Sequence, residues 1–145
     1  MYIKIEKHVF VILFLLFLSY PVFSQSETID SLLNQVEAAR GTKKVQAYND
    51  LSKALWGTNP DSSLLLAQKA LALAKELKNK KAISDAYNRI GNAYYFKEMN
   101  DSTEFYYNKC LQLRKKLDDY QRIVQIYHNY AIYYRNQGNI KKVGD

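Results

Sequence analysis

The chain has 145 residues, a formal net charge of +7 and a hydrophobic content of 48%, and its single cysteine excludes an intramolecular disulfide. This length allows one small domain with a modest core and much exposed surface. Two prolines and five glycines leave no linker-like tract, and one of the two histidines lies among the first ten residues, which leaves no histidine pair for a zinc site.

The first 24 residues have the pattern of a secretory signal peptide. Lys4 and Lys7 give a positive start, residues 9–18 are an unbroken apolar run, and residues 22–24 have the small-x-small form that signal peptidase cleaves. Ten apolar residues fall short of the ~20 that a membrane-spanning helix needs. We therefore expect cleavage after residue 24, a mature net charge of +6, and an exported protein in the periplasm or cell envelope of a bacterium. The alternative is an uncleaved membrane anchor.

A helical period runs through the rest of the chain. Ile29, Leu32, Leu33 and Val36 have the i, i+3, i+4, i+7 spacing of an amphipathic helix, which predicts a helix over residues 28–39 that Gly41 ends. Five more helices are expected at about residues 43–56, 61–78, 81–96, 101–117 and 119–137.

Acidic residues stand where several of these helices should begin. Asp61, Asp101 and Asp119 are the predicted N-caps, and Glu104 would complete a capping box with Asp101. Gly138 is placed to close the last helix as a C-cap glycine.

The segment 61–77 returns forty positions later as segment 101–117, with seven of the seventeen aligned residues identical. Tyr87 likewise returns as Tyr127. A fixed period of about 20 to 50 residues is typical of a solenoid, in which each unit buries its apolar face against the next. We therefore divide the mature chain into an N-terminal packing helix (25–42), a first unit (43–80), a second unit (81–118) and an incomplete third unit (119–145).

The second unit has an aromatic-aliphatic-small-aromatic pattern on its first helix and a small-aromatic-small pattern on its second. The residues are Tyr87, Ile90, Gly91 and Tyr94, then Thr103, Tyr107 and Cys110. This pattern resembles the tetratricopeptide repeat. The resemblance implies an all-α, right-handed superhelix of antiparallel helix pairs with about two and a half repeats. The period near forty is similar to that of longer-helix members, such as those of kinesin light chains and bacterial regulatory and sensor proteins.

Two residues of the pattern have a direct packing interpretation. Gly91 should let the two helices of the second unit approach closely. Cys110 occupies the place of Ala70 in the first unit, so we expect a buried packing thiol rather than a reactive one.

The resemblance also implies a partner-binding groove along the first helices of the units. Its candidate residues share one helical face at i, i+4, i+7. They are Asn49, Lys53 and Trp56 in the first unit, Asn88, Asn92 and Tyr95 in the second, and His128, Ile132 and Arg135 in the third. Amides beside aromatic rings suit an extended peptide of a protein partner. A merely solvated inner face is the alternative.

Catalysis has no support in the motifs. The sequence has no G-x-S-x-G, P-loop or G-x-G-x-x-G, and His128 lacks an identifiable nucleophile partner. We expect no enzyme activity, no catalytic residue, no cofactor and no metal site. The basic residues gather at helix ends, where cations favour the negative end of the helix dipole, so we expect no nucleic-acid partner.

The last predicted helix presents an apolar face with no helix after it, and the residues of this face are Ile126, Tyr127, Tyr130, Ile132, Tyr133 and Tyr134. This predicts either a longer protein or self-association through that helix. The expected function is a protein- or peptide-interaction module. The alternative is the signal-input region of a longer bacterial histidine kinase or transcription regulator, and membrane association through the N-terminus or a downstream segment stays open.

Overall fold

The computed structural model describes residues 28–138, so the predicted signal peptide and residues 139–145 of the third unit lie outside the described residues. Within residues 28–138 all regular secondary structure is helical, which confirms the all-α class. An N-terminal helix (residues 28–38) precedes α2 (Gly41–Leu55), α3 (Pro60–Glu76), α4 (Lys80–Phe96), α5 (Asn100–Lys115) and α6 (Tyr120–Asn136). None of the described helices combines the length and the apolar character that crossing a membrane requires.

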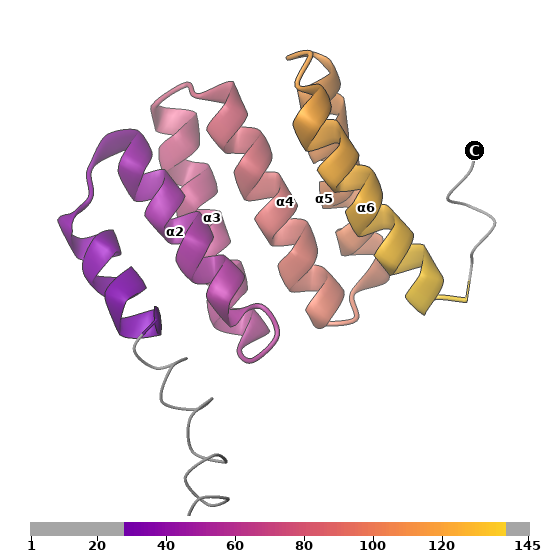
Figure 1. Ribbon diagram of the computed structural model, residues 1–145, viewed down its shortest axis with the longest axis horizontal. Helices are drawn as coiled ribbons and strands as arrows, with labels where there is room; N and C mark the ends of the chain where they lie inside the picture. The colour runs from indigo at the N-terminus through magenta and orange to yellow at the C-terminus, as the bar shows by residue number, and fades with distance from the viewer. Residues whose placement is uncertain (1–27, 139–145) are drawn as a thin grey trace, which may run out of the picture.

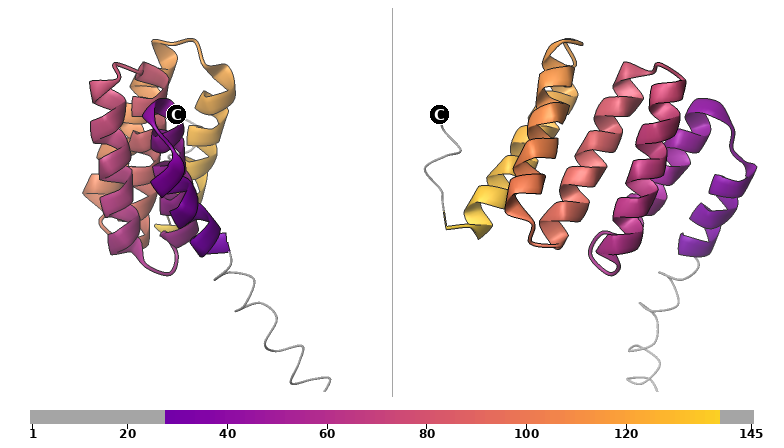
Figure 2. Two further views of the ribbon diagram at one scale, coloured as in Figure 1. Left: turned by 90° about the vertical axis from the view of Figure 1, so that its left-hand side faces the viewer. Right: turned by 180° about the vertical axis from the view of Figure 1, so that it is seen from behind.

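Successive helices run antiparallel, and each packs on the next one in the chain (Figure 1). They form two layers, with α2, α4 and α6 in front and α3 and α5 behind, as the side view of Figure 2 shows. Within the front layer α2 contacts α4, and a hydrogen bond from Asn129 to Asn88 joins α6 to α4. We call it the α2–α4–α6 face.

The helices restart at a fixed interval of twenty residues. The helices α3, α4, α5 and α6 begin at residues 60, 80, 100 and 120. The residue before each start is the N-cap: the side chains of Asn59, Asn79 and Asp119 accept a hydrogen bond from the backbone N–H three residues on, whereas Met99 makes no such bond. Hence three of the four helices have a satisfied cap and α5 does not.

Two of the predicted caps are wrong. Pro60 is the first residue of α3, where its fixed φ is pre-organised for a helix, so Asp61 already lies inside the first turn. Asp101 is likewise the second residue of α5, and Glu104 forms no capping box. Its carboxylate instead accepts a hydrogen bond from the Tyr134 hydroxyl at 3.0 Å.

The helix ends are equally regular. Lys78, Glu98 and Asp118 adopt the left-handed backbone conformation, with φ of 51°, 57° and 52°, and Gly138 follows in the same register with φ of 70°. After α3, α4 and α5, the next N–H bonds to the carbonyl oxygen five residues back, at 3.0 to 3.2 Å. This is the long hydrogen bond of a Schellman motif, which turns the chain by the same amount each time. The prediction that Gly138 closes the last helix is confirmed.

Burial repeats as the sequence does. From residue 61 to 76 and from residue 101 to 116, each position is buried, half-buried or exposed in the same order. The buried residues are Ser63, Ala67, Ala70 and Ala74 on α3, and Thr103, Tyr107, Cys110 and Arg114 on α5. The two helices therefore occupy equivalent places although their buried side chains differ in size and charge.

Gly91 and Tyr107 show how the second unit packs. A Cβ atom at Gly91 would lie 2.5 Å from Cδ1 of Tyr107, so only glycine fits against this ring. At the equivalent positions of the first unit stand Ser52 and Ala67, and the Ser52 hydroxyl hydrogen-bonds to Ser63 at 3.0 Å. Of these two units, only the second packs an aromatic ring, that of Tyr107, against a glycine of the other helix.

Cys110 is buried, as predicted, with its sulfur 3.2 Å from the Ser84 hydroxyl. Burial raises the pKa of this thiol, which keeps it protonated and unreactive.

Helix α6 is only partly uncovered. Ile126, Tyr130 and Tyr133 are buried against the second unit, so the expected uncovered face is wrong for these three residues, whereas Tyr127 is exposed as expected. The uncovered apolar residues of α6 are Tyr120, Val124 and Tyr127.

Candidate functional site

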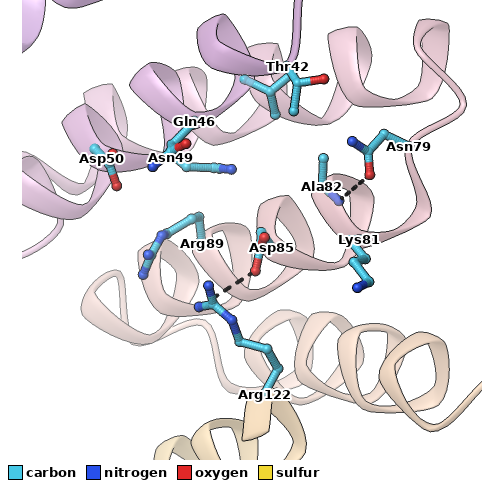
Figure 3. A pocket seen from close by; sticks show the side chains of 11 residues that line it. Thr42, Gln46, Asn49, Asp50, Asn79, Lys81, Ala82, Asp85, Arg89 and Arg122 are labelled. Carbon is cyan, nitrogen blue, oxygen red and sulfur yellow. Dashed lines mark hydrogen bonds and ion pairs between the residues drawn. The ribbon is translucent and has the colours of Figure 1, made fainter. Parts of the chain in front are cut away.

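Two hollows of opposite character lie on the α2–α4–α6 face. The polar hollow, shown in Figure 3, has a volume of about 290 Å³. It is lined by Thr42, Val45, Gln46, Asn49, Asp50, Asn79, Lys81, Ala82, Asp85, Arg89 and Arg122. The apolar hollow has a volume of about 140 Å³ and is lined by Trp56, Asn92, Tyr95, Phe96, Tyr107, Asn129 and Ile132.

The apolar hollow brings together four of the nine predicted groove residues. Trp56 is the residue at which α2 ends, Tyr95 belongs to the last turn of α4, and Ile132 comes from α6. Trp56 stacks on Phe96, with ring centroids 6.0 Å apart. Asn92 is the fourth predicted residue, and its carbonyl oxygen accepts a hydrogen bond from the buried Tyr107 hydroxyl at 2.6 Å. This geometry gives an apolar recess with aromatic walls and a polar floor.

The predicted groove residues Asn88 and Asn92 are buried, with exposed fractions of 5% and 7%. The Oδ1 atom of Asn88 accepts a hydrogen bond from Nδ2 of Asn129 at 2.8 Å, which links α4 to α6. Asn88 lines neither hollow. The structure thus gives Asn88 a role in holding the two helices together.

Asn49 is in the opposite situation. Its side chain lines the polar hollow and is only 6% exposed. Its Oδ1 atom is buried without a hydrogen-bond partner among the described residues. Buried polar atoms are nearly always paired in native proteins, so this acceptor is exceptional.

Four predicted groove residues lie outside both hollows. Besides Asn88, they are Lys53, His128 and Arg135, which are exposed and line neither the polar nor the apolar hollow. The structure therefore does not bring these four together with the other five.

Arg89 is a residue that the sequence reasoning missed. It extends from α4 into the polar hollow, and its guanidinium lies 5.7 Å from the Trp56 ring, so it joins the two hollows. Burial lowers the pKa of Arg89, and the carboxylates of Asp85 and Asp50 partly offset that effect. The Nε atom of Arg89 is buried without a hydrogen-bond partner.

A buried ion-pair cluster forms one wall of the polar hollow. The side chain of Arg114 is only 2% exposed and pairs with Asp85 and Asp119, and it also donates to the backbone carbonyl of Lys81 at 3.3 Å. Arg122 approaches Asp85 to 3.9 Å (Figure 3). Asp85 is thus matched by two arginines.

Asp50 is the other carboxylate of the polar hollow, and it is the second acidic residue that acts on Arg89. Each carboxylate therefore has a cation near it, and the hollow carries polar groups without a large excess of either charge. Among residues 28–138, no group of three or more histidine, cysteine, aspartate or glutamate side chains could hold a metal ion.

No protein-family model, curated protein or solved structure matches this chain. The resemblance to the tetratricopeptide repeat therefore depends on the sequence pattern alone. Function has to be inferred from the two hollows and the residues that line them.

Proposed function

We propose that the chain is a tetratricopeptide-type solenoid that acts as a protein-interaction module without catalysis. Its α2–α4–α6 face would bind an extended peptide segment of a partner protein. The observation that carries this proposal is the presence of an apolar and a polar hollow on one face, with Arg89 lining the polar hollow 5.7 Å from the ring of Trp56, which lines the apolar one.

The size of the hollows favours a peptide over a small-molecule cofactor. Sites for drug-sized ligands usually measure about 300–1,000 Å³ and enclose most of the ligand. The apolar hollow, at about 140 Å³, has room for one aliphatic side chain, and the polar hollow, at about 290 Å³, for one hydrogen-bonding group. An extended peptide offers both, because its successive side chains are spaced along one line.

The apolar hollow is expected to supply most of the binding energy. Buried tryptophan and tyrosine side chains dominate interface energetics, and Trp56 and Tyr95 form its walls. The polar hollow would then set the position and specificity of the peptide, as hydrogen-bonding groups do at most interfaces.

Peptide selection tests the proposal directly. A phage library of random peptides would be selected on the purified chain, and the winning peptides measured by isothermal titration calorimetry. We expect Trp56→Ala and Ile132→Ala to weaken binding at least tenfold, which corresponds to about 1.4 kcal/mol.

The back layer offers a matched control. Phe105 of α5 is 52% exposed and lies away from both hollows. Phe105→Ala should leave binding unchanged, and circular dichroism should show that all three variants keep their helical content. Selected peptides that lose affinity in Phe105→Ala and keep it in Trp56→Ala would contradict the proposal, as would a selection that yields no peptide.

A further inference from the structure

Two equivalent pairs of positions on the α2–α4–α6 face differ in one hydrogen bond. Between α4 and α6, Nδ2 of Asn129 donates to Oδ1 of Asn88 at 2.8 Å. The same positions one unit earlier hold Asn49 on α2 and Arg89 on α4, 39 and 40 residues before Asn88 and Asn129. Here the bond is not made: Oδ1 of Asn49 and Nε of Arg89 are both buried without partners.

Both unpaired atoms belong to side chains that line the polar hollow. Figure 3 shows the Asn49 side chain entering the hollow from α2, and Arg89 coming from α4. A buried polar group without a hydrogen bond destabilises a fold, and a ligand that supplies the bond recovers the loss. The hollow therefore lies where a bound group would complete the interactions of both side chains.

The two unpaired atoms need hydrogen-bond partners of opposite kinds. Oδ1 of Asn49 can only accept a hydrogen bond, and Nε–H of Arg89 can only donate one. A carboxylate would serve Arg89 and leave Asn49 unpaired, and it would meet the carboxylates of Asp50 and Asp85. An ammonium group would donate a hydrogen bond to Asn49 but would be repelled by the positive charges of Arg89 and Arg122. An amide has an acceptor and a donor side by side and carries no charge.

We propose that the polar hollow binds an amide group. The amide oxygen would accept from Nε–H of Arg89, and the amide N–H would donate to Oδ1 of Asn49. The other step of the array supports this chemistry, because there a carboxamide of the chain itself, that of Asn129, bonds to the equivalent asparagine.

This inference rests on the proposed function and deepens it. The amide is either the side chain of a glutamine or asparagine in the bound peptide, or a peptide group of its backbone. Both present the same acceptor and donor, so small probes are needed to separate them.

Three probes would be titrated into the full chain by NMR: the N-acetyl methylamides of glutamine, glutamate and alanine. We expect the glutamine probe to bind with a Kd of order millimolar, as suits a fragment of this size, and at least tenfold more tightly than the glutamate probe. Equal binding of all three probes, which share the same backbone amides, assigns the interaction to the backbone amide and not to the glutamine side chain. Tighter binding of the glutamate probe, or no binding of any probe, overturns the proposal.

Asn49→Leu gives a second readout that a purely structural role would not produce. Leucine has a similar volume and removes the unpaired acceptor, so the variant should lose the probe and at the same time raise Tm by about 2–5 °C. Arg89→Met should also lose the probe.

Asn88→Leu is the matched control. It removes an asparagine that is already paired and leaves Asn129 only the longer bond to Oδ1 of Asn92 at 3.5 Å, so it should lower Tm and retain the probe. If Asn49→Leu lowers Tm as Asn88→Leu does and still binds the probe, the amide site does not exist.

The two proposals fail in different ways. Selected peptides that depend on Trp56, together with no probe binding, overturn the amide assignment alone. Probe binding that depends on Asn49, together with no selected peptide, overturns the peptide-binding function and leaves a site for a small amide.

Discussion

Equivalent positions in the first and second units carry different side chains on the same backbone. In the second unit, the ring of Tyr107 lies against Gly91, where there is no room for a Cβ atom. In the first unit, Ser52 takes the place of Gly91 and Ala67 that of Tyr107. The second unit thus places an aromatic ring between its two helices, whereas the first has two small side chains there and a hydrogen bond between Ser52 and Ser63.

The charged cluster gives a second contrast. Arg114 is buried between Asp85 and Asp119 in the second unit. The equivalent residues of the first unit are Ala74, Gln46 and Asn79, none of which is charged. The two units therefore differ in charge at three positions, although residues 61–76 of the first and 101–116 of the second have the same burial pattern.

These contrasts show that the helices keep their places through the turns and the burial pattern, and that side chains vary in coupled sets. A whole set of contacting side chains can differ between units, but replacing one side chain of a set alone should destabilise the fold. Where a set lacks a member, as with Asn49 and Arg89, the unmade bond coincides with a hollow.

The largest effect is expected at Tyr107. Tyr107→Ala should lower the free energy of unfolding by about 3–5 kcal/mol, because it leaves a cavity in the second unit. Gly91→Ser should cost about 1–3 kcal/mol through overpacking against the ring. In the double variant, which copies the first unit, the serine has room, so the combined loss should be smaller than the sum in urea unfolding.

Gly57→Ala is the control for this double-mutant comparison of Gly91 and Tyr107. A Cβ atom there would lie 3.7 Å from Cε1 of Phe96, an ordinary contact, so this variant should change stability little. Strict additivity of Gly91→Ser and Tyr107→Ala would show that the two positions are not coupled.

The charged cluster should show the next largest effect. Arg114→Ala leaves Asp85 and Asp119 without their buried cation, which should cost about 3 kcal/mol in chemical unfolding. The triple variant Asp85→Gln, Arg114→Ala, Asp119→Asn reproduces the first unit and should regain a large part of that loss. A triple variant less stable than Arg114→Ala would disprove the equivalence of the two sets.

A rise to alkaline pH should destabilise the second unit and α6 before it destabilises the first unit. Burial, with the hydrogen bond to Glu104, raises the pKa of Tyr134 from 10.0 to about 12, and burial also raises the pKa of Tyr107 and Tyr130. The folded state then keeps protons that the unfolded state releases, so these groups contribute full stability below about pH 10 and lose it as the pH rises toward 12.

Helices α2 and α3 contain a single tyrosine, so the loss should begin in the second half of the array. Tyrosinate absorbance should change at a lower pH than the fluorescence of Trp56, the only tryptophan. Tyr134→Phe should flatten the fall in unfolding free energy between pH 10 and 12. An unchanged slope would exclude Tyr134 from the effect.

The smallest effect concerns the cap of α5. Met99 has φ of −89° and ψ of 79°, close to the backbone of the capping Asp119 at −90° and 71°. Met99→Asn should therefore stabilise the fold by about 1 kcal/mol without moving the chain. Asn79→Met, the reverse exchange at the start of α4, should cost a similar amount by thermal unfolding, and a Met99→Asn variant no more stable than the parent would contradict this.

Much of the fold could be predicted because it depends on local signals. The apolar period placed every described helix end within two residues. The caps were harder, because Asp61 and Asp101 are good capping residues that lie two positions after the actual N-caps. Pro60, a typical first residue of a helix, was the signal that could have corrected α3.

The candidate site was less predictable because it depends on contacts between units. The helical face at i, i+4, i+7 selected Trp56 and Ile132 correctly as neighbours, although 76 residues separate them. It could not show that Asn129 would pair with Asn88, nor that Arg89, one position off that face, would reach the hollow. A cation in the middle of a helix with many buried residues was the available sign.

The interval of twenty residues between helix starts would let the chain gain helix pairs by duplication of its coding DNA. Residues 79–118 begin with a capping asparagine and end with a left-handed aspartate, and the next residue, Asp119, caps α6 as Asn79 caps α4. A tandem duplication of the DNA that encodes these residues would keep the reading frame and join two turns that already have matching geometry. The array can in this way gain a helix pair in one genetic event, and each gain adds another helix to the face that carries the hollows.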